Sequence, residues 1–172
     1  GDSARAAAAP APRFADARLA EHQVELLDLA FAVLADMPVP MHLKDQARVQ
    51  HEVVEACFDL DAPQRALAYV ERIGNWRKGA GYADYALYAA RHGDADSALH
   101  YIEKAEAVAA ELAADELAQA WRIDEIRTRI GTTHVALSDE ARAAALEIDL
   151  EPATTFAVDA ERARALAEED FD

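Results

Sequence analysis

Apolar residues recur along most of the chain at the three-to-four-residue spacing of one face of an α-helix. Between residues 16 and 36, for example, this spacing is kept by Leu19, Val24, Leu27, Phe31 and Leu34. Runs rich in Val or Ile are few, so the sequence offers little from which strands could form. The pattern therefore predicts an all-α protein with about seven or eight helices.

Proline and glycine mark where these helices should end. Residues 37–40 contain two prolines, and the residue before a proline avoids the α conformation. No proline occurs between Pro63 and Pro152, as expected for helices joined by glycine or polar turns. We expect helices over about these residues: 16–36, 43–60, 63–73, 80–91, 95–113, 115–137, 139–151 and 155–168.

Short polar residues before three of these helices are candidate N-caps. We expect Asp61 to cap the third helix, Asp94 or Asp96 to cap the fifth, and Ser138 to cap the seventh. Gly93 suits the left-handed position that follows the fourth helix.

The clearest repeating unit in the chain covers residues 79–112. Its large and small residues follow in the order Tyr82, Tyr85, Ala86, Ala89, Gly93, Ala98, Ile102 and Ala105. This order resembles a tetratricopeptide (TPR) repeat, in which two antiparallel helices form one hairpin. Small residues let the paired helices approach, and large ones fill the gaps between them.

Two weaker units flank the clear one. The small-residue anchor Ala66 lies 32 residues before Ala98, and Ala143 lies 45 residues after it. The resemblance covers residues 47–150. It implies stacked antiparallel helix hairpins that form a short right-handed TPR-like α-solenoid, with the hairpin over 16–60 acting as a cap.

Composition divides the chain into three parts. Residues 1–14 form a low-complexity Ala/Pro leader or linker, residues 15–168 a single helical repeat domain, and residues 169–172 an acidic tail. Such a leader is typical of a tether behind a cleaved export signal, which points to an exported or periplasmic protein. A cytoplasmic location is the alternative.

The charge of the chain limits its partners. Thirty-three acidic residues against 17 basic ones give a net charge of −16. Such a chain is repelled by phosphate backbones, so we expect no nucleic-acid partner. No stretch has the roughly 20 apolar residues that a membrane span needs.

The one cysteine, Cys57, cannot close an internal disulfide or complete a Cys/His zinc motif.

Motifs of common enzyme classes are absent. None of the six histidines follows a glutamate by three residues, as the helices of di-iron proteins require. The sequence also lacks the motifs of zinc proteases, serine hydrolases and phosphate-binding loops. We therefore expect a non-enzymatic protein with no cofactor and no metal.

TPR proteins generally recognise peptides or partner segments on the concave face formed by the first helix of each hairpin. By this resemblance the face contains Arg48, His51, Glu55, Asp59, Ala83, Leu87, Ala90, Arg91, Thr128 and Thr132. Arg48 and His51 lie one helical turn apart and could together bind a carboxylate. The resemblance implies a scaffold or adaptor whose partner is another protein or peptide, held in a shallow, partly apolar groove. An ordinary solvated helix face and a purely structural module are the alternatives, and the oligomeric state is open.

A second candidate site is the segment Trp76-Arg77-Lys78, which we place in a loop between glycines. An indole beside two cations can hold an anionic or aromatic group. This interpretation predicts a small-ligand-binding or regulatory domain, with Trp121 outside the site. Alternatively, Trp76 only fills the junction between two repeats.

Four tyrosines lie close together in the clear repeat. Tyr82 and Tyr85 occupy repeat-packing positions, so we expect them in the core. Tyr88 and Tyr101 fall outside those positions, so we expect them to be exposed, with Tyr88 available to a partner.

Overall fold

A computed structural model describes residues 14–35, 43–115, 119–147 and 156–169. Within these ranges the protein has eight helices and no strand, which confirms the all-α prediction. The helices are α1 (Glu21–Ala35), α2 (Leu43–Asp59), α3 (Pro63–Val70), α4 (Arg77–Arg91), α5 (Ala95–Ala113), α6 (Ala120–Ala136), α7 (Glu140–Glu147) and α8 (Phe156–Glu169).

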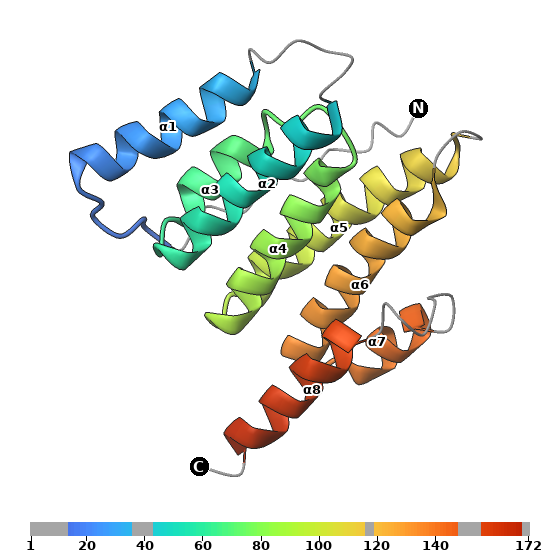
Figure 1. Cartoon of the computed structure of the whole chain (residues 1–172). Helices are drawn as coiled ribbons and strands as arrows, with labels where there is room; N and C mark the ends of the chain where they lie inside the picture. Colours follow the sequence, from blue (N-terminus) through green and yellow to red (C-terminus); the bar gives the residue numbers. More distant parts are fainter. Residues whose placement is uncertain (1–13, 36–42, 116–118, 148–155, 170–172) are drawn as a thin grey trace, which may run out of the picture.

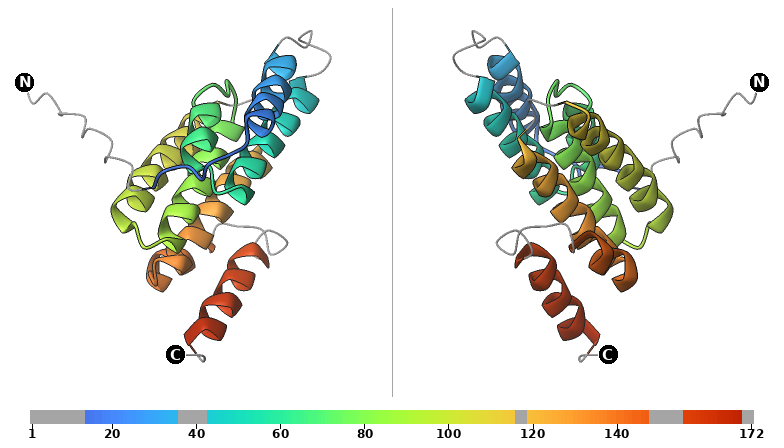
Figure 2. Two further views of the ribbon diagram at one scale, coloured as in Figure 1. Left: turned by 90° about the vertical axis from the view of Figure 1, so that its left-hand side faces the viewer. Right: turned by 90° about the vertical axis from the view of Figure 1, so that its right-hand side faces the viewer.

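Alternate helices share a layer. Figure 1 shows α2, α4 and α6 side by side, with α3 and α5 behind them, and the side views of Figure 2 agree. In the second layer α3 packs against α2 and α4, and α5 packs against α4 and α6. Both α7 and α8 contact α6, whereas α1 lies against α2. Helix α4 therefore occupies the middle of the molecule.

The core between the layers combines aromatic rings with very small residues. The ring of Tyr85 is fully buried, with its centroid 4.5 Å from that of Tyr101. A Cβ atom on Gly81 would come within 2.6 Å of Val70, and one on Gly79 within 2.8 Å of Ile126. Glycine therefore allows α4 to approach its neighbours closely.

The turns between α2 and α3, between α4 and α5, and between α6 and α7 share one geometry. We call these three helix pairs the first, second and third hairpins. Asp61, Gly93 and Ser138 all have positive φ, at 51°, 76° and 58°. The amide of the following residue then donates to the carbonyl five residues earlier, over 2.8, 2.9 and 2.8 Å respectively. Such a bond and a left-handed residue together end a helix in the Schellman manner. The anchors Ala66, Ala98 and Ala143, each five residues after the left-handed residue, are all fully buried.

One predicted cap is replaced by a distant residue. Asp61 does not cap α3, because its positive φ puts it in the turn. The N-cap position is Ala62, whose methyl side chain cannot accept a hydrogen bond. Instead the carboxylate of Asp16 accepts the amides of Gln64 at 2.6 Å and Arg65 at 3.2 Å.

The other caps follow the same turn geometry. Asp94 caps α5, accepting the Ser97 amide at 3.2 Å, so the first of its two candidates is confirmed. Ser138 does not cap α7, because it takes the left-handed position that Gly93 has in the previous hairpin. Asp139 accepts the amide of Arg142 in its place, at 3.3 Å.

Several predicted boundaries shift. Helix α1 begins at Glu21 rather than at residue 16, since Asp16 is used as the cap of α3. Helix α4 begins at Arg77 rather than at residue 80, so the predicted loop is the first turn of a helix. Tyr101, expected to be exposed, is buried, while Tyr82 and Tyr85 lie in the core as predicted. The turn at 37–40, Pro152 and almost all of the leader and tail lie outside the described residues.

Candidate functional site

Two surface cavities adjoin each other across the α2, α4 and α6 layer. A cavity of about 510 Å³ lies between α4, α6 and α8, and one of about 500 Å³ lies beside α2 and α4. Leu87 and Arg91 line both cavities. We call their union the cross-helix groove, lined by Glu55, Phe58, Asp59, Asp61, Asp84, Leu87, Tyr88, Arg91, His92, Glu125, Thr128, Arg129, Thr132, Ala160, Glu161 and Arg164.

Most of the residues assigned to the concave face lie in this groove. Those that line it are Glu55, Asp59, Leu87, Arg91, Thr128 and Thr132. Ala83, Ala90 and His51 are buried beneath the surface. Arg48 lines a different cavity and pairs with Glu52 at 2.6 Å. The structure therefore does not bring Arg48 and His51 together as a surface clamp.

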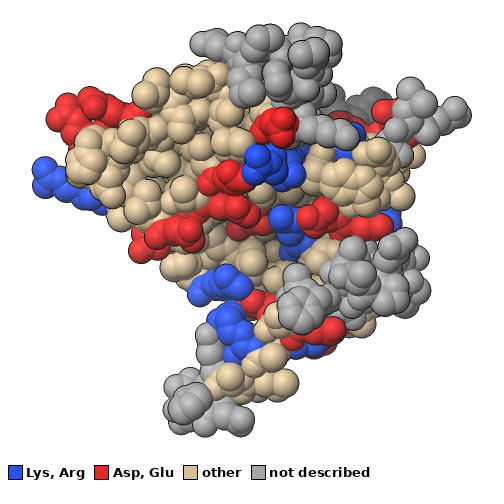
Figure 3. Space-filling view, in the orientation of Figure 1, with Lys and Arg blue, Asp and Glu red and all other residues tan. Residues whose placement is uncertain are grey.

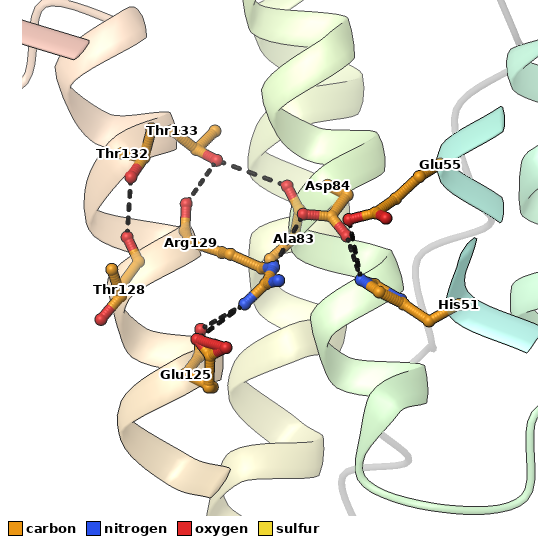
Figure 4. Close-up of polar contacts among 9 residues, drawn as sticks. All are labelled: His51, Glu55, Ala83, Asp84, Glu125, Thr128, Arg129, Thr132 and Thr133. Atoms are coloured by element: carbon orange, nitrogen blue, oxygen red, sulfur yellow. Dashed lines mark hydrogen bonds and ion pairs between the residues drawn. The ribbon is translucent and has the colours of Figure 1, made fainter. Parts of the chain in front are cut away.

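A chain of ionisable side chains lies along the bottom of the groove and links its three central helices (Figure 4). His51 Nε2 of α2 lies 3.4 Å from Asp84 Oδ2 of α4 and 3.5 Å from Glu55 Oε1. Asp84 Oδ1 accepts a hydrogen bond of 3.0 Å from Arg129 Nε of α6, and Arg129 Nη1 donates to Glu125 Oε2 at 3.0 Å. These contacts bridge α2, α4 and α6 through side chains alone.

Burial decides the charge of the central residues in this chain. It lowers the pKa of His51 to about 4, helped by the nearby Arg129 cation, so the imidazole is neutral at pH 7. Burial raises the pKa of Asp84, and the Arg129 cation with its hydrogen bond opposes that rise. The pKa of Arg129 is raised because the opposing carboxylates outweigh its own burial. The neutral imidazole thus lies beside the hydrogen bond between Asp84 and Arg129.

Helix α8 closes one end of the groove through a buried carboxylate. Glu161 is only 3% exposed and lies between two arginines. Arg91 Nη2 donates to it at 2.5 Å, and Arg164 Nη2 at 2.6 Å. Burial alone would raise the pKa of Glu161, but the hydrogen bonds from Arg164 and Arg91 lower it. The ionised carboxylate therefore fastens α8 to α4.

A separate cavity, outside the cross-helix groove, lies near the N-terminal ends of α4 and α6. Its volume is about 270 Å³. We call it the tryptophan cavity, lined by Asp45, Ala47, Arg48, Asn75, Trp76, Arg77, Trp121 and Arg122. The rings of Trp76 and Trp121 pack edge to face, with centroids 5.2 Å apart. The structure thus places Trp121 inside the site from which the sequence analysis excluded it.

The three residues of the predicted Trp-Arg-Lys site diverge. The Arg77 guanidinium lies 4.7 Å from the centre of the Trp76 ring. Lys78 turns to the other layer, where its Nζ donates to the Glu71 carbonyl at 3.0 Å. Of the two predicted cations, only Arg77 therefore reaches the tryptophan cavity.

Tyr88, the remaining candidate, lies in the cross-helix groove as part of an aromatic stack. Its ring stacks on His92 at 4.0 Å between centroids and on Phe58 at 5.6 Å. The Tyr88 side chain is partly buried rather than exposed.

Several site residues were missed from the sequence. Trp121 follows Trp76 by 45 residues, and Arg129 follows Asp84 by the same number. This is also the spacing between the anchors Ala98 and Ala143. A strict alignment of the hairpin α4–α5 with the hairpin α6–α7 would have placed these residues at equivalent positions. Glu161 has no such signal, because α8 follows the last recognised repeat.

Comparisons with protein-family models, with curated proteins and with solved structures found no match for this chain. Among the described residues, no group of three or more His, Cys, Asp or Glu side chains is placed to hold a metal ion. None of the described helices combines the length and apolar character needed to cross a membrane. Cys57 is fully buried, and burial raises the pKa of its thiol to about 12.

Proposed function

We propose that this protein is a non-enzymatic interaction module that binds a peptide or partner helix in the cross-helix groove. In this proposal the fold is a short right-handed TPR-like α-solenoid, built from the hairpins α2–α3, α4–α5 and α6–α7. Helix α8 extends the layer that lines the groove. The module acts as a scaffold or adaptor and uses no cofactor.

The equivalence of the three hairpins supports the solenoid. Each has the same left-handed turn residue, the same hydrogen bond back to the preceding helix and the same buried alanine five residues on. The third hairpin keeps these features although its repeat is 45 residues long. A sequence that repeats one turn and one contact in this way buries its apolar faces by stacking.

The observation that carries the function is that two cavities adjoin each other across this layer. Two cavities of about 500 Å³ share Leu87 and Arg91 and run across four helices. Figure 3 shows acidic and basic side chains interleaved in a band over this face. An elongated groove suits an extended segment or a helix.

The charges of the groove suit binding better than catalysis. Asp84, Arg129 and Glu161 are each held by a hydrogen-bonded partner of opposite charge. His51 is neutral at pH 7 and buried, so it meets no ligand at the surface. Fixed charges of this kind favour one orientation of a partner and repel others.

A selection experiment tests the proposal. Peptides selected from a random displayed library on the immobilised protein should lose binding about tenfold or more when Leu87→Arg fills the groove centre with a charged side chain. Leu99→Arg is the matched control, because Leu99 is an exposed leucine of α5 outside the groove. Equal loss in both variants, or none in Leu87→Arg, would contradict the proposal.

A further inference from the structure

Both tryptophans of the chain meet in the tryptophan cavity together with three arginines. Trp76 and Arg77 stand at the start of α4, and Trp121 and Arg122 stand 45 residues later at the start of α6. The same pair of residues thus enters one cavity from two successive helices. Helix N-termini also carry partial positive charge, which adds to that of the guanidinium groups.

Two of these arginines have no anionic partner among the residues that the structure describes. Arg77 and Arg122 form no ion pair there, whereas Arg48 is paired with Glu52. The Nε atom of Arg122 is buried and has no hydrogen-bond partner in the same residues. Leaving such a charged donor unsatisfied is costly. An acceptor from outside the described structure would satisfy it.

The surroundings of Arg77 strengthen this requirement. Burial and the neighbouring Arg129 cation lower its pKa, and Glu125 and Glu55 offset this only in part, so a further anion would stabilise the positive charge. Among the described residues of the cavity wall, Asp45 is the one carboxylate, and it stands against three arginines. In a protein of net charge −16, this local excess of positive charge marks a place for an anion.

The size and the aromatic wall narrow the class of ligand. A volume of about 270 Å³ is just below the range of about 300–1,000 Å³ typical of sites for whole small molecules. One or two amino-acid side chains fit better than a nucleotide. Tryptophan rings favour aromatic groups placed edge to face or offset, and guanidinium groups pair with both oxygens of a carboxylate.

We propose that the tryptophan cavity binds a carboxylate with an adjoining aromatic ring. Two sources present this chemistry: an internal acidic residue next to an aromatic one, and a free C-terminal aromatic residue. The idea that a peptide carries this group rests on the proposed function. The preference of the cavity for a carboxylate and an aromatic ring does not depend on it.

Tryptophan fluorescence reports on this cavity, because both tryptophans of the chain line it. We expect a saturable change on titration with N-acetyl-phenylalanine, with a blocked peptide containing Asp-Phe, or with both. The responding probe identifies the source of the carboxylate. N-acetyl-phenylalanine amide, which lacks the carboxylate, and acetate, which lacks the ring, should each cause no saturable change. A response to the amide as strong as that to the acid, or no response to either carboxylate probe, overturns the proposal.

A pair of variants separates a specific site from a general effect. Arg122→Gln should weaken the responding probe about tenfold or more, as expected for the loss of a charge-assisted hydrogen bond. Arg72→Gln should leave binding unchanged, because Arg72 also lies over an aromatic ring, at 4.6 Å from that of Phe31, but outside the cavity. Unchanged binding by Arg122→Gln overturns the proposal. Leu87→Arg should bind the probe normally, so failure of the groove proposal would leave this result intact.

Discussion

At the scale of single residues, His51 is held neutral inside a charged group. Its imidazole is 4% exposed and lies within 3.5 Å of the carboxylates of Glu55 and Asp84. Burial and the Arg129 cation lower the pKa of the ring, and they outweigh the Glu55 and Glu125 carboxylates, which raise it. The ring therefore packs between α2 and α4 as an uncharged side chain.

This environment makes folding stability depend on pH. The pKa of His51 is about 4 in the folded protein and about 6.5 in an unfolded chain. Protonation therefore favours unfolding, so the contribution of His51 is complete above pH 6.5. It falls by up to about 3 kcal/mol as the pH drops from 6.5 to 4. Urea unfolding at pH 7 and pH 5 measures this loss.

The matched variant for this test is His51→Gln, which keeps a polar side chain but does not titrate. We expect its free energy of unfolding to decrease less between pH 7 and pH 5 than that of the unsubstituted protein. An equal decrease in both proteins would show that other groups cause the dependence. His134 is the first alternative, because burial also lowers its pKa.

At the scale of helices and turns, the sequence predicts the hairpins better than their caps. Gly93 and the anchor Ala98 identify the second hairpin by residue type alone. Asp61 and Ser138 fill the same left-handed position without being glycine, so the sequence marks them as caps instead. The true cap of α3, Asp16, comes from 48 residues away. No local pattern shows a contact of this kind.

The common turn geometry can be tested by exchanging glycine between hairpins. Gly93→Ala should lower the free energy of unfolding by about 1 kcal/mol, because an alanine is strained at positive φ. Ser138→Gly should raise it by about 0.5 kcal/mol, since glycine relieves that strain at some cost in chain entropy. Urea midpoints of the two variants give both values. A destabilising Ser138→Gly would contradict the equivalence of the second and third turns.

At the scale of the whole molecule, the helical spacing of apolar residues predicts the all-α fold class. The recurrence of similar helix pairs along the sequence accounts for the two layers. The sequence also indicated seven of the residues that line the cross-helix groove, including Leu87, Tyr88 and Arg91. It did not show that His51 turns inward, since that depends on how α2 packs against α4. It did not show the contact between Arg91 and Glu161, which are 70 residues apart. Contacts between charged residues on different helices cannot be predicted from the spacing of residues within one helix.

The most direct test of the account is to map where a selected peptide binds, by NMR chemical-shift changes in the isotope-labelled protein. The account predicts the largest changes in the groove segments of α2, α4 and α6, around Glu55, Leu87 and Thr128, with smaller ones in α8 near Glu161. Changes concentrated on the outer face of α5, around Leu99, would contradict it.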